Sequence, residues 1–181
     1  MKWIGYLLSS LWRIWFLIVF ILVFIAFIPA LFFFTAIYKN NKIVCHLTRY
    51  WSKLTLFFSF IYPSVEWEEK LDKKGHYIFC PNHVSTLDIP LILAVLPMPL
   101  QYMGKAEIAK IPLFGYFYKN NTVVVDRANR RDAYDAFLKA GEQLKKGINM
   151  CIFPEGGIPK ADVFLKKFKN GSFRLAIEQD I

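Results

Sequence analysis

The chain has 181 residues, which is enough for one modest domain and too few for two. Hydrophobic residues make up 55% of it and aromatic residues 18%, with most of the excess before Tyr62, which excludes an ordinary soluble protein and favours a membrane protein with a soluble part. The formal net charge of +9 indicates an anionic partner; since no zinc-finger or RNA-binding signature accompanies it, a membrane surface is favoured and nucleic acid is not expected.

The segment Ile14 to Ile37 carries no charged residue and predicts a membrane helix. Such a helix would extend about 36 Å, more than the roughly 30 Å hydrocarbon thickness of a bilayer. It is too long for a signal-peptide core, so we expect it to be retained, and Pro29 predicts a kink in it. Because both flanks are basic, two arrangements stay open: one span with the more basic flank in the cytosol, or a kinked insertion with both ends on the cytosolic face.

The next segment, Ile43 to Ile61, predicts an amphipathic helix that ends before Pro63. Apolar residues recur every three or four positions, at Val44, Leu47, Trp51, Leu54, Phe58 and Ile61. This stripe suits a helix in the membrane interface, a helix packed on a protein core, or both, and it favours the kinked arrangement. We therefore predict a membrane-associated two-helix motif over residues 1–64 and an α/β domain over residues 65–181.

After a charged connection, strands and helices alternate along the chain. The patterns predict strands at Tyr77–Cys80, Leu100–Met103, Val123–Val125 and Asn149–Phe153, and helices at Ile89–Leu96, Asn129–Lys146 and Asn170–Ile177. Strand, helix and strand in this order imply right-handed parallel crossovers. The expected fold is α/β, a mixed and largely parallel sheet flanked by helices and preceded by the two-helix membrane motif.

The cysteines lie far apart in apolar or helical contexts and form no Cys-x-x-Cys pair; they are Cys45, Cys80 and Cys151. We expect reduced core residues, which agrees with a soluble part in the cytosol.

His83 and Asp88 lie at the corner between the first predicted strand and the helix that follows it. Such corners face the ligand crevices of open α/β sheets. The carboxylate can hold the histidine ring while the other ring nitrogen accepts a proton, which is two-thirds of a catalytic triad without its serine. The alternative is capping, because Ser85-x-x-Asp88 fits a capping box and a helix N-terminus favours a carboxylate.

Two further blocks accompany the corner. One runs from Gly104-Lys105 through Pro112-Leu113-Phe114-Gly115 to Val123–Arg127, and the other is Phe153-Pro154-Glu155-Gly156-Gly157. Together with Asn82-His83-x4-Asp88, they make the chain from about Leu71 onward resemble the glycerolipid acyltransferase family, whose best-known members are the lysophosphatidic acid acyltransferases. The resemblance implies that Lys105 and Arg127 bind the acceptor phosphate and that Glu155, Gly156 and Gly157 help to form the acceptor site near His83.

The chain departs from the family pattern in two places. The third block commonly continues Gly-Thr-Arg-Ser, but this chain has Gly157-Ile158-Pro159-Lys160, so the arginine is missing and Lys160 is a candidate substitute. A fourth block is expected just after Asn170–Ile177, whereas the sequence stops at Ile181. We expect either that the sequence is a fragment or that the acyl-binding side is built differently.

The family chemistry implies that His83 removes the proton from an acceptor hydroxyl as that oxygen attacks the thioester of acyl-CoA or an acyl carrier protein. Backbone donors near the corner would stabilise the developing oxyanion. No metal and no further cofactor is expected, because His76, His83 and Asp88 do not form a familiar ligand spacing. The expected partners are membrane lipid, a lysophospholipid acceptor and the acyl thioester, and the catalytic domain would lie on the cytosolic face of a membrane.

Three alternatives remain. The missing arginine leaves room for another acceptor, such as a lyso-aminolipid. A non-catalytic lipid-binding protein would need only the basic N-terminal region. A hydrolase would need Ser85 or Cys80 as its nucleophile, but neither lies in a Gly-x-Ser-x-Gly elbow.

Overall fold

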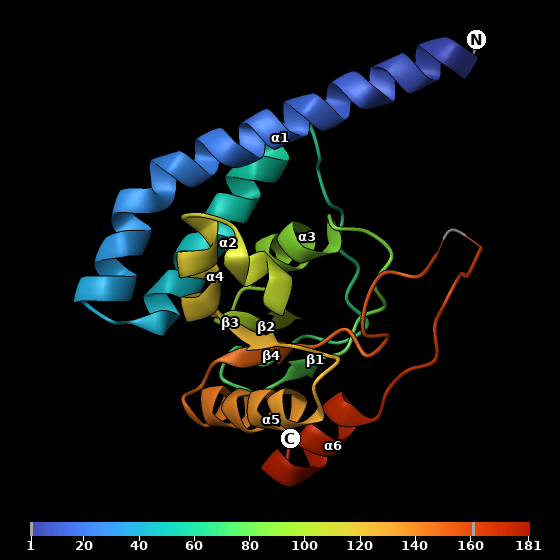
Figure 1. Ribbon diagram of the computed structural model, residues 1–181. Helices are drawn as coiled ribbons and strands as arrows, with labels where there is room; N and C mark the ends of the chain where they lie inside the picture. The colour runs from blue at the N-terminus through green and yellow to red at the C-terminus, as the bar shows by residue number, and fades with distance from the viewer. Residues whose placement is uncertain (1, 161) are drawn as a thin grey trace.

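The computed structural model describes residues 2–160 and 162–181 of the chain (Figure 1). In chain order the elements are α1 (Lys2–Phe32), η1 (Phe33–Ile37, a π-helical turn), α2 (Asn41–Phe58), β1 (Ile78–Phe79), α3 (Asp88–Val95), β2 (Leu100–Lys105), η2 (Ala106–Lys110, 3₁₀), α4 (Phe114–Asn121), β3 (Thr122–Val125), α5 (Arg130–Lys145), β4 (Asn149–Cys151) and α6 (Gly171–Gln179).

The four described strands form one sheet in the order β1-β4-β2-β3, and every pairing is parallel. Ile78 pairs with Met150, and Tyr102 pairs with both Cys151 and Thr122. All carboxyl ends of the strands therefore lie at the same edge. The predicted α/β class is confirmed, although β1 and β4 are shorter than the runs predicted for them.

Helices cover both faces of the sheet (Figure 1). Helices α5 and α6 lie on one face, where Leu144, Met150 and Leu175 belong to one buried cluster. Helix α3 lies on the other face, where Leu93 packs in a cluster with Tyr102 and Phe153. Helices α1, α2 and α4 lie on that same side of the sheet. The result is a three-layered α/β arrangement with the long α1 outside it.

The N-terminal helix is longer than predicted, because it begins at Lys2 rather than near Ile14. Among the described residues, one helix is long and apolar enough to cross a membrane; it runs from Trp3 to Ile37. Pro29 lies inside it, and Figure 1 shows the helix bending toward its C-terminal end, before the π-helical turn. Most of its N-terminal half is exposed apolar surface.

Helix α2 folds back along α1. The indole N–H groups of Trp12 and Trp15 donate to the carbonyls of Ser59 and Phe58 at 3.2 and 2.9 Å. Farther along, Trp51 of α2 packs with the rings of Phe20 and Phe24 of α1 at centroid distances of 4.8 and 6.4 Å. The two helices therefore form a packed pair.

The predicted apolar stripe of α2 is only partly right. Val44 and Trp51 are buried, but Leu54 and Phe58 are exposed. The positions buried in their place are mostly small and polar, namely Ser52, Thr55, Leu56 and Ser59. Small side chains allow neighbouring helices to approach closely, so the buried face is offset from the most apolar one.

Sequence patterns missed the two elements between β2 and β3. The 3₁₀ turn η2 and the helix α4 have five and eight residues, too few to show a clear helical period. Gly115 lets α4 pack against this turn, since a Cβ at this position would collide with the backbone carbonyl of Ala109. The caps of α5 agree with prediction: the Asn129 side chain accepts from two backbone N–H groups, and Gly147 adopts a φ of 75°.

Candidate active site

The topology brings two of the three sequence blocks together at the carboxyl edge of the sheet. Strand β1 leads into the loop that carries His83, and its neighbour β4 leads into the loop that carries Glu155. Because these strands are adjacent and parallel, the two loops leave the sheet side by side. The Glu155 carboxylate accepts a hydrogen bond of 2.7 Å from the backbone N–H of His83.

The imidazole of His83 is held by Asp88. Its Nδ1 lies 2.8 Å from Asp88 Oδ2, and the two side chains are only 12% and 15% exposed. The same carboxylate oxygen accepts the backbone N–H groups of Val84 and Ser85 at 2.8 and 2.9 Å. Asp88 thus caps the turn and orients the ring at once, and both interpretations of this residue apply. With Nδ1 donating to the carboxylate, Nε2 is the nitrogen that can accept a proton.

Aromatic packing fixes the plane of the imidazole. The His83 ring stacks on Phe153 at a centroid distance of 3.9 Å and an interplanar angle of 16°. Phe153 stacks in turn on Tyr102, whose hydroxyl donates to the carbonyl of Ile89 at 2.9 Å. Burial raises the pKa of Tyr102 well above its ordinary value, so the phenol keeps its proton and continues to donate.

Glu155 is a bridging carboxylate. It is 4% exposed, and its two oxygens accept from different backbone N–H groups, Oε1 from His83 at 2.7 Å and Oε2 from Lys166 at 3.1 Å. A buried carboxylate requires such partners. The side chain therefore ties the histidine loop to the chain segment that follows the third block.

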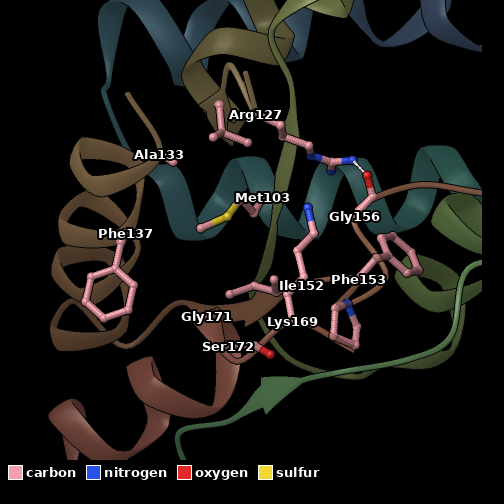
Figure 2. A pocket seen from close by; sticks show the side chains of 12 residues that line it. Met103, Arg127, Ala133, Phe137, Ile152, Phe153, Gly156, Lys169, Gly171 and Ser172 are labelled. Carbon is pink, nitrogen blue, oxygen red and sulfur yellow. Dashed lines mark hydrogen bonds between the residues drawn. The ribbon is translucent and has the colours of Figure 1, made fainter. Parts of the chain in front are cut away.

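Arg127 and Gly156 of the third block line a cavity of about 210 Å³ (Figure 2). Arg127, two residues beyond β3, donates from Nη1 to the carbonyl of Gly156. The positive φ of Gly156, 74°, suits glycine, and a Cβ there would lie 3.1 Å from Lys169 Nζ. Figure 2 shows the amine of Lys169 directed toward Arg127 and Gly156, so two cations flank the cavity.

Apolar side chains make up most of the rest of the cavity lining, which includes Met103, Val125, Phe137, Ile152 and Phe153. Phe153 is also the residue on which the His83 ring stacks, whereas His83 itself is not part of the lining. The carboxyl edge of the sheet therefore carries an oriented imidazole and, linked to it through Phe153, a cavity with cationic and apolar lining.

The other two predicted lysines lie differently. Lys105 ends β2 in register with Val125, close to Arg127 in the fold, but its Nζ pairs with exposed Glu107 at 3.0 Å. Lys160 is exposed and does not line the cavity; in the described part of the chain, Lys169 does. Sequence reasoning missed Lys169, Phe153 and Tyr102. The signal that could have found Lys169 was the helix predicted to begin at Asn170. That helix packs near the site, so the residue just before it also lies there.

The backbone N–H groups of His83, Val84 and Ser85 all donate to carboxylates, so an oxyanion would need other donors. Oxyanion stabilisation by backbone donors near the corner stays a prediction. Within the described residues, no group of three or more His, Cys, Asp or Glu side chains is arranged as a metal site.

Known proteins place this arrangement in a family. A sequence profile described as Acyltransferase matches residues 63–181. The 1-acyl-sn-glycerol-3-phosphate acyltransferase of Saccharomyces cerevisiae is 35% identical over 112 residues, which cover 60% of this chain and 37% of the yeast protein. The lyso-ornithine lipid O-acyltransferase of Pseudomonas aeruginosa is 37% identical over 79 residues, 44% of this chain and 30% of that protein. The chain thus spans about a third of each enzyme.

A solved structure matches the whole chain. The crystal structure of the 1-acyl-sn-glycerophosphate (LPA) acyltransferase PlsC from Thermotoga maritima superposes with a TM-score of 0.72 and 29% identity, covering 100% of this chain and 73% of that one. The profile match includes the loops of His83, Asp88 and Glu155. The chain therefore belongs to the acyltransferase family.

Proposed function

We propose that this chain is a membrane-bound acyltransferase that moves a fatty acyl group from an acyl thioester to the hydroxyl of a lysophospholipid, with lysophosphatidic acid as the preferred acceptor. The observation that carries the proposal is the His83 ring, which Asp88 orients and which stacks on Phe153, a residue that also lines the cavity flanked by Arg127 and Lys169. The family membership and the relatives named for this reaction support it.

In the proposed reaction, His83 Nε2 takes the proton of the acceptor hydroxyl as that oxygen attacks the thioester carbonyl carbon. The C–S bond then breaks, the new ester bond remains, and the thiol leaves with the proton that His83 returns. Asp88 stabilises the imidazolium that forms between these steps. A covalent acyl-enzyme is unnecessary, because the thioester is already activated and holding both substrates in place supplies much of the acceleration.

The cavity suggests how a lysophosphatidic acid would lie. Arg127 and Lys169 offer positive charge and several N–H donors to a phosphate, and a guanidinium can bind one with two parallel hydrogen bonds. Lys105 remains a proposed contributor from the same edge, and Lys160 of the neighbouring loop remains the alternative to Lys169. Glu155, Gly156 and Gly157 would shape this side of the site, with glycine allowing close approach of the backbone.

The long apolar helix α1 gives the membrane a role in the reaction. Both an acyl chain and a lysophospholipid reside in a bilayer, so a site held at its surface need not extract them into water. We propose that the catalytic side faces the cytosol and that either acyl-CoA or an acyl carrier protein delivers the acyl group.

A second acceptor class is favoured by a specific observation. The arginine usual after the third block is absent, and the lyso-ornithine lipid O-acyltransferase is among the relatives. The purified chain would be given a labelled acyl thioester and equal amounts of lysophosphatidic acid and a lyso-aminolipid in mixed micelles, with products identified by mass. We expect phosphatidic acid to dominate; transfer mainly to the aminolipid would overturn the preferred acceptor and keep the reaction.

A further inference from the structure

Three consecutive apolar side chains project into solvent beside the candidate site. Val163, Phe164 and Leu165 are all exposed, and Phe164 is 89% exposed, more than any other large apolar residue in the described chain. They follow the third block, on the segment that Figure 1 shows projecting away from the sheet. Exposed apolar residues that cluster in this way indicate an interaction surface. We call these three residues the apolar tip.

The base of the projecting segment is anchored to the site. The backbone N–H of Lys166 donates to Glu155 Oε2 at 3.1 Å, and its amine donates to the carbonyls of Gly157 and Ile158 at 3.3 and 3.0 Å. The N–H of Lys169 donates to the carbonyl of Pro154 at 2.9 Å. Glu155 also accepts a hydrogen bond from the His83 backbone N–H. The same carboxylate therefore holds both the histidine loop and the chain segment that carries the apolar tip.

Basic residues accompany the apolar tip. Lys160 precedes it and Lys167 follows it, with Asp162 as the nearby acid, whereas the amine of Lys166 is held by backbone carbonyls. Lysines next to exposed aromatic and aliphatic residues are typical of segments that dip into an anionic bilayer surface, because the rings enter the acyl boundary while the amines meet phosphate groups. The overall charge of +9 is positive like these lysines, so the whole chain is attracted to an anionic surface.

The position of the tip suits a bilayer. In Figure 1 the projecting segment and the N-terminal end of α1 extend toward the same side of the molecule, the side to which the carboxyl ends of the strands point. The exposed residues of α1 include Trp3, Leu7 and Leu11, so this helix half also needs an apolar environment.

We propose that Val163, Phe164 and Leu165 insert into the anionic membrane surface as a second contact, separate from α1, that holds the mouth of the site at the level of the lipid headgroups. An acidic acyl carrier protein is the competing occupant, because it too would attract the lysines. The three adjacent apolar side chains favour the bilayer, since they need a hydrocarbon environment.

The test uses the full chain with a fluorescent reporter. Phe164→Cys is combined with Cys80→Ala, because the other two cysteines are buried, and labelled with an environment-sensitive dye. Ile177→Cys on α6, at a residue 81% exposed, is the matched control in the same background. Both proteins are reconstituted into vesicles of phosphatidylcholine and phosphatidylglycerol, with and without brominated lipid.

We expect a blue shift in vesicles and quenching by brominated lipid at position 164, and neither at position 177. Equal emission at the two positions would overturn the proposal. A blue shift at position 164 that needs acyl carrier protein, or that grows with protein concentration in detergent, would also overturn it and point to a protein partner. This readout does not depend on acyl transfer, so it tests membrane insertion separately from the proposed function.

A second measurement rests on the proposed function. Phe164→Ser should raise the apparent KM for acceptor carried in vesicles by about tenfold, the order expected when one buried phenylalanine ring is lost, and leave kcat with a short-chain soluble acceptor unchanged. An equal loss with both acceptors would mean that the tip acts on the fold or the site and not on the membrane.

Discussion

A single carboxylate oxygen, Oδ2 of Asp88, accepts three hydrogen bonds at the candidate site, one from the imidazole and two from the backbone. Asp88→Asn removes the negative charge but keeps the size of the side chain. The imidazolium that forms during transfer then loses its stabilising partner, so we expect kcat to fall by about 10²-fold or more while the KM for acceptor changes little. Steady-state kinetics in mixed micelles checks this.

Ser85→Ala is the matched control for the same turn. Its hydroxyl accepts only the backbone N–H of Leu87, at 3.2 Å, so its loss should cost about 1 kcal/mol of stability or less and leave kcat within a few-fold of the parent. If Asp88→Asn kept the parental kcat, Asp88 would be a capping residue alone.

The cations near the cavity allow a second comparison at the residue scale. Arg127→Ala and Lys169→Gln remove positive charge from the cavity lining, whereas Lys160→Gln removes it from an exposed position outside that lining. A charged hydrogen bond to phosphate contributes about 1.5–3 kcal/mol, so we expect the KM for lysophosphatidic acid to rise about tenfold or more with either of the first two changes.

Lys160→Gln should leave that KM within about twofold if Lys169 takes the place of the missing arginine. The opposite ranking, with Lys160→Gln harmful and Lys169→Gln neutral, would assign the role to Lys160. Acceptors without a phosphomonoester serve as the reference, because their KM should respond to none of the three changes.

At the scale of elements, β4 is the strand that links the sheet to the site, and its last residue, Cys151, is fully buried. Burial raises the pKa of the Cys151 thiol, so the thiol stays protonated at pH values where an ordinary thiol, with a pKa of about 8.5, has begun to ionise. In the unfolded chain this thiol ionises normally. This residue therefore contributes stability to the folded state that is fully present below the ordinary thiol pKa of about 8.5. That contribution is lost as the pH rises from there toward the raised pKa of the folded state.

Alkylation by iodoacetamide at mildly alkaline pH reports on this arrangement. Because the thiolate is the reactive form, we expect the folded protein to be modified at half-buried Cys80 first and at buried Cys45 and Cys151 only after denaturation. Peptide mass spectrometry identifies the sites. Rapid modification of Cys151 in the folded protein would mean that β4 is open to solvent, which contradicts the sheet order described above.

Most of the fold was predictable, because the longer elements carry strong local signals. The helix over residues 129–146 has an asparagine cap, a clear period and a terminal glycine, and it forms nearly as predicted. Helix α4 was not predictable, since eight residues rich in aromatic side chains show no period. The buried face of α2 was misjudged because Ser52, Thr55 and Ser59 are buried by close helix packing, which hydrophobicity alone does not reveal.

The candidate site was predictable where its residues lie in short motifs. His83 and Asp88 were recognised by type and spacing, and Glu155 and Arg127 through the family resemblance. The structure brings all four to one edge of the sheet, although their roles stay predictions. The stacking of Phe153 on His83 depends on how neighbouring strands align. No pattern within one segment encodes that contact.

At the scale of the whole molecule, the N-terminal helices and the α/β domain share packing. Phe24 of α1, Trp51 of α2 and Phe117 of α4 belong to one buried cluster, so the N-terminal helices continue the interior of the domain. The division into a helical motif (1–64) and an α/β domain (65–181) remains a prediction from the sequence. In the structure, this cluster joins the two parts. Under the proposal that α1 enters a bilayer, such packing would fix the orientation of the site relative to it.

The central claim is that His83 is the base for acyl transfer at the membrane. The most direct measurement is the rate at which labelled acyl groups pass from acyl-CoA to lysophosphatidic acid. It is compared for the parent chain, His83→Ala and the matched variant His76→Ala, which alters an exposed histidine away from Asp88 and Glu155. We predict that His83→Ala loses about 10²–10⁴-fold in rate while it stays membrane-bound, and that His76→Ala keeps the parental rate. A His83→Ala protein as active as the parent would contradict the mechanism.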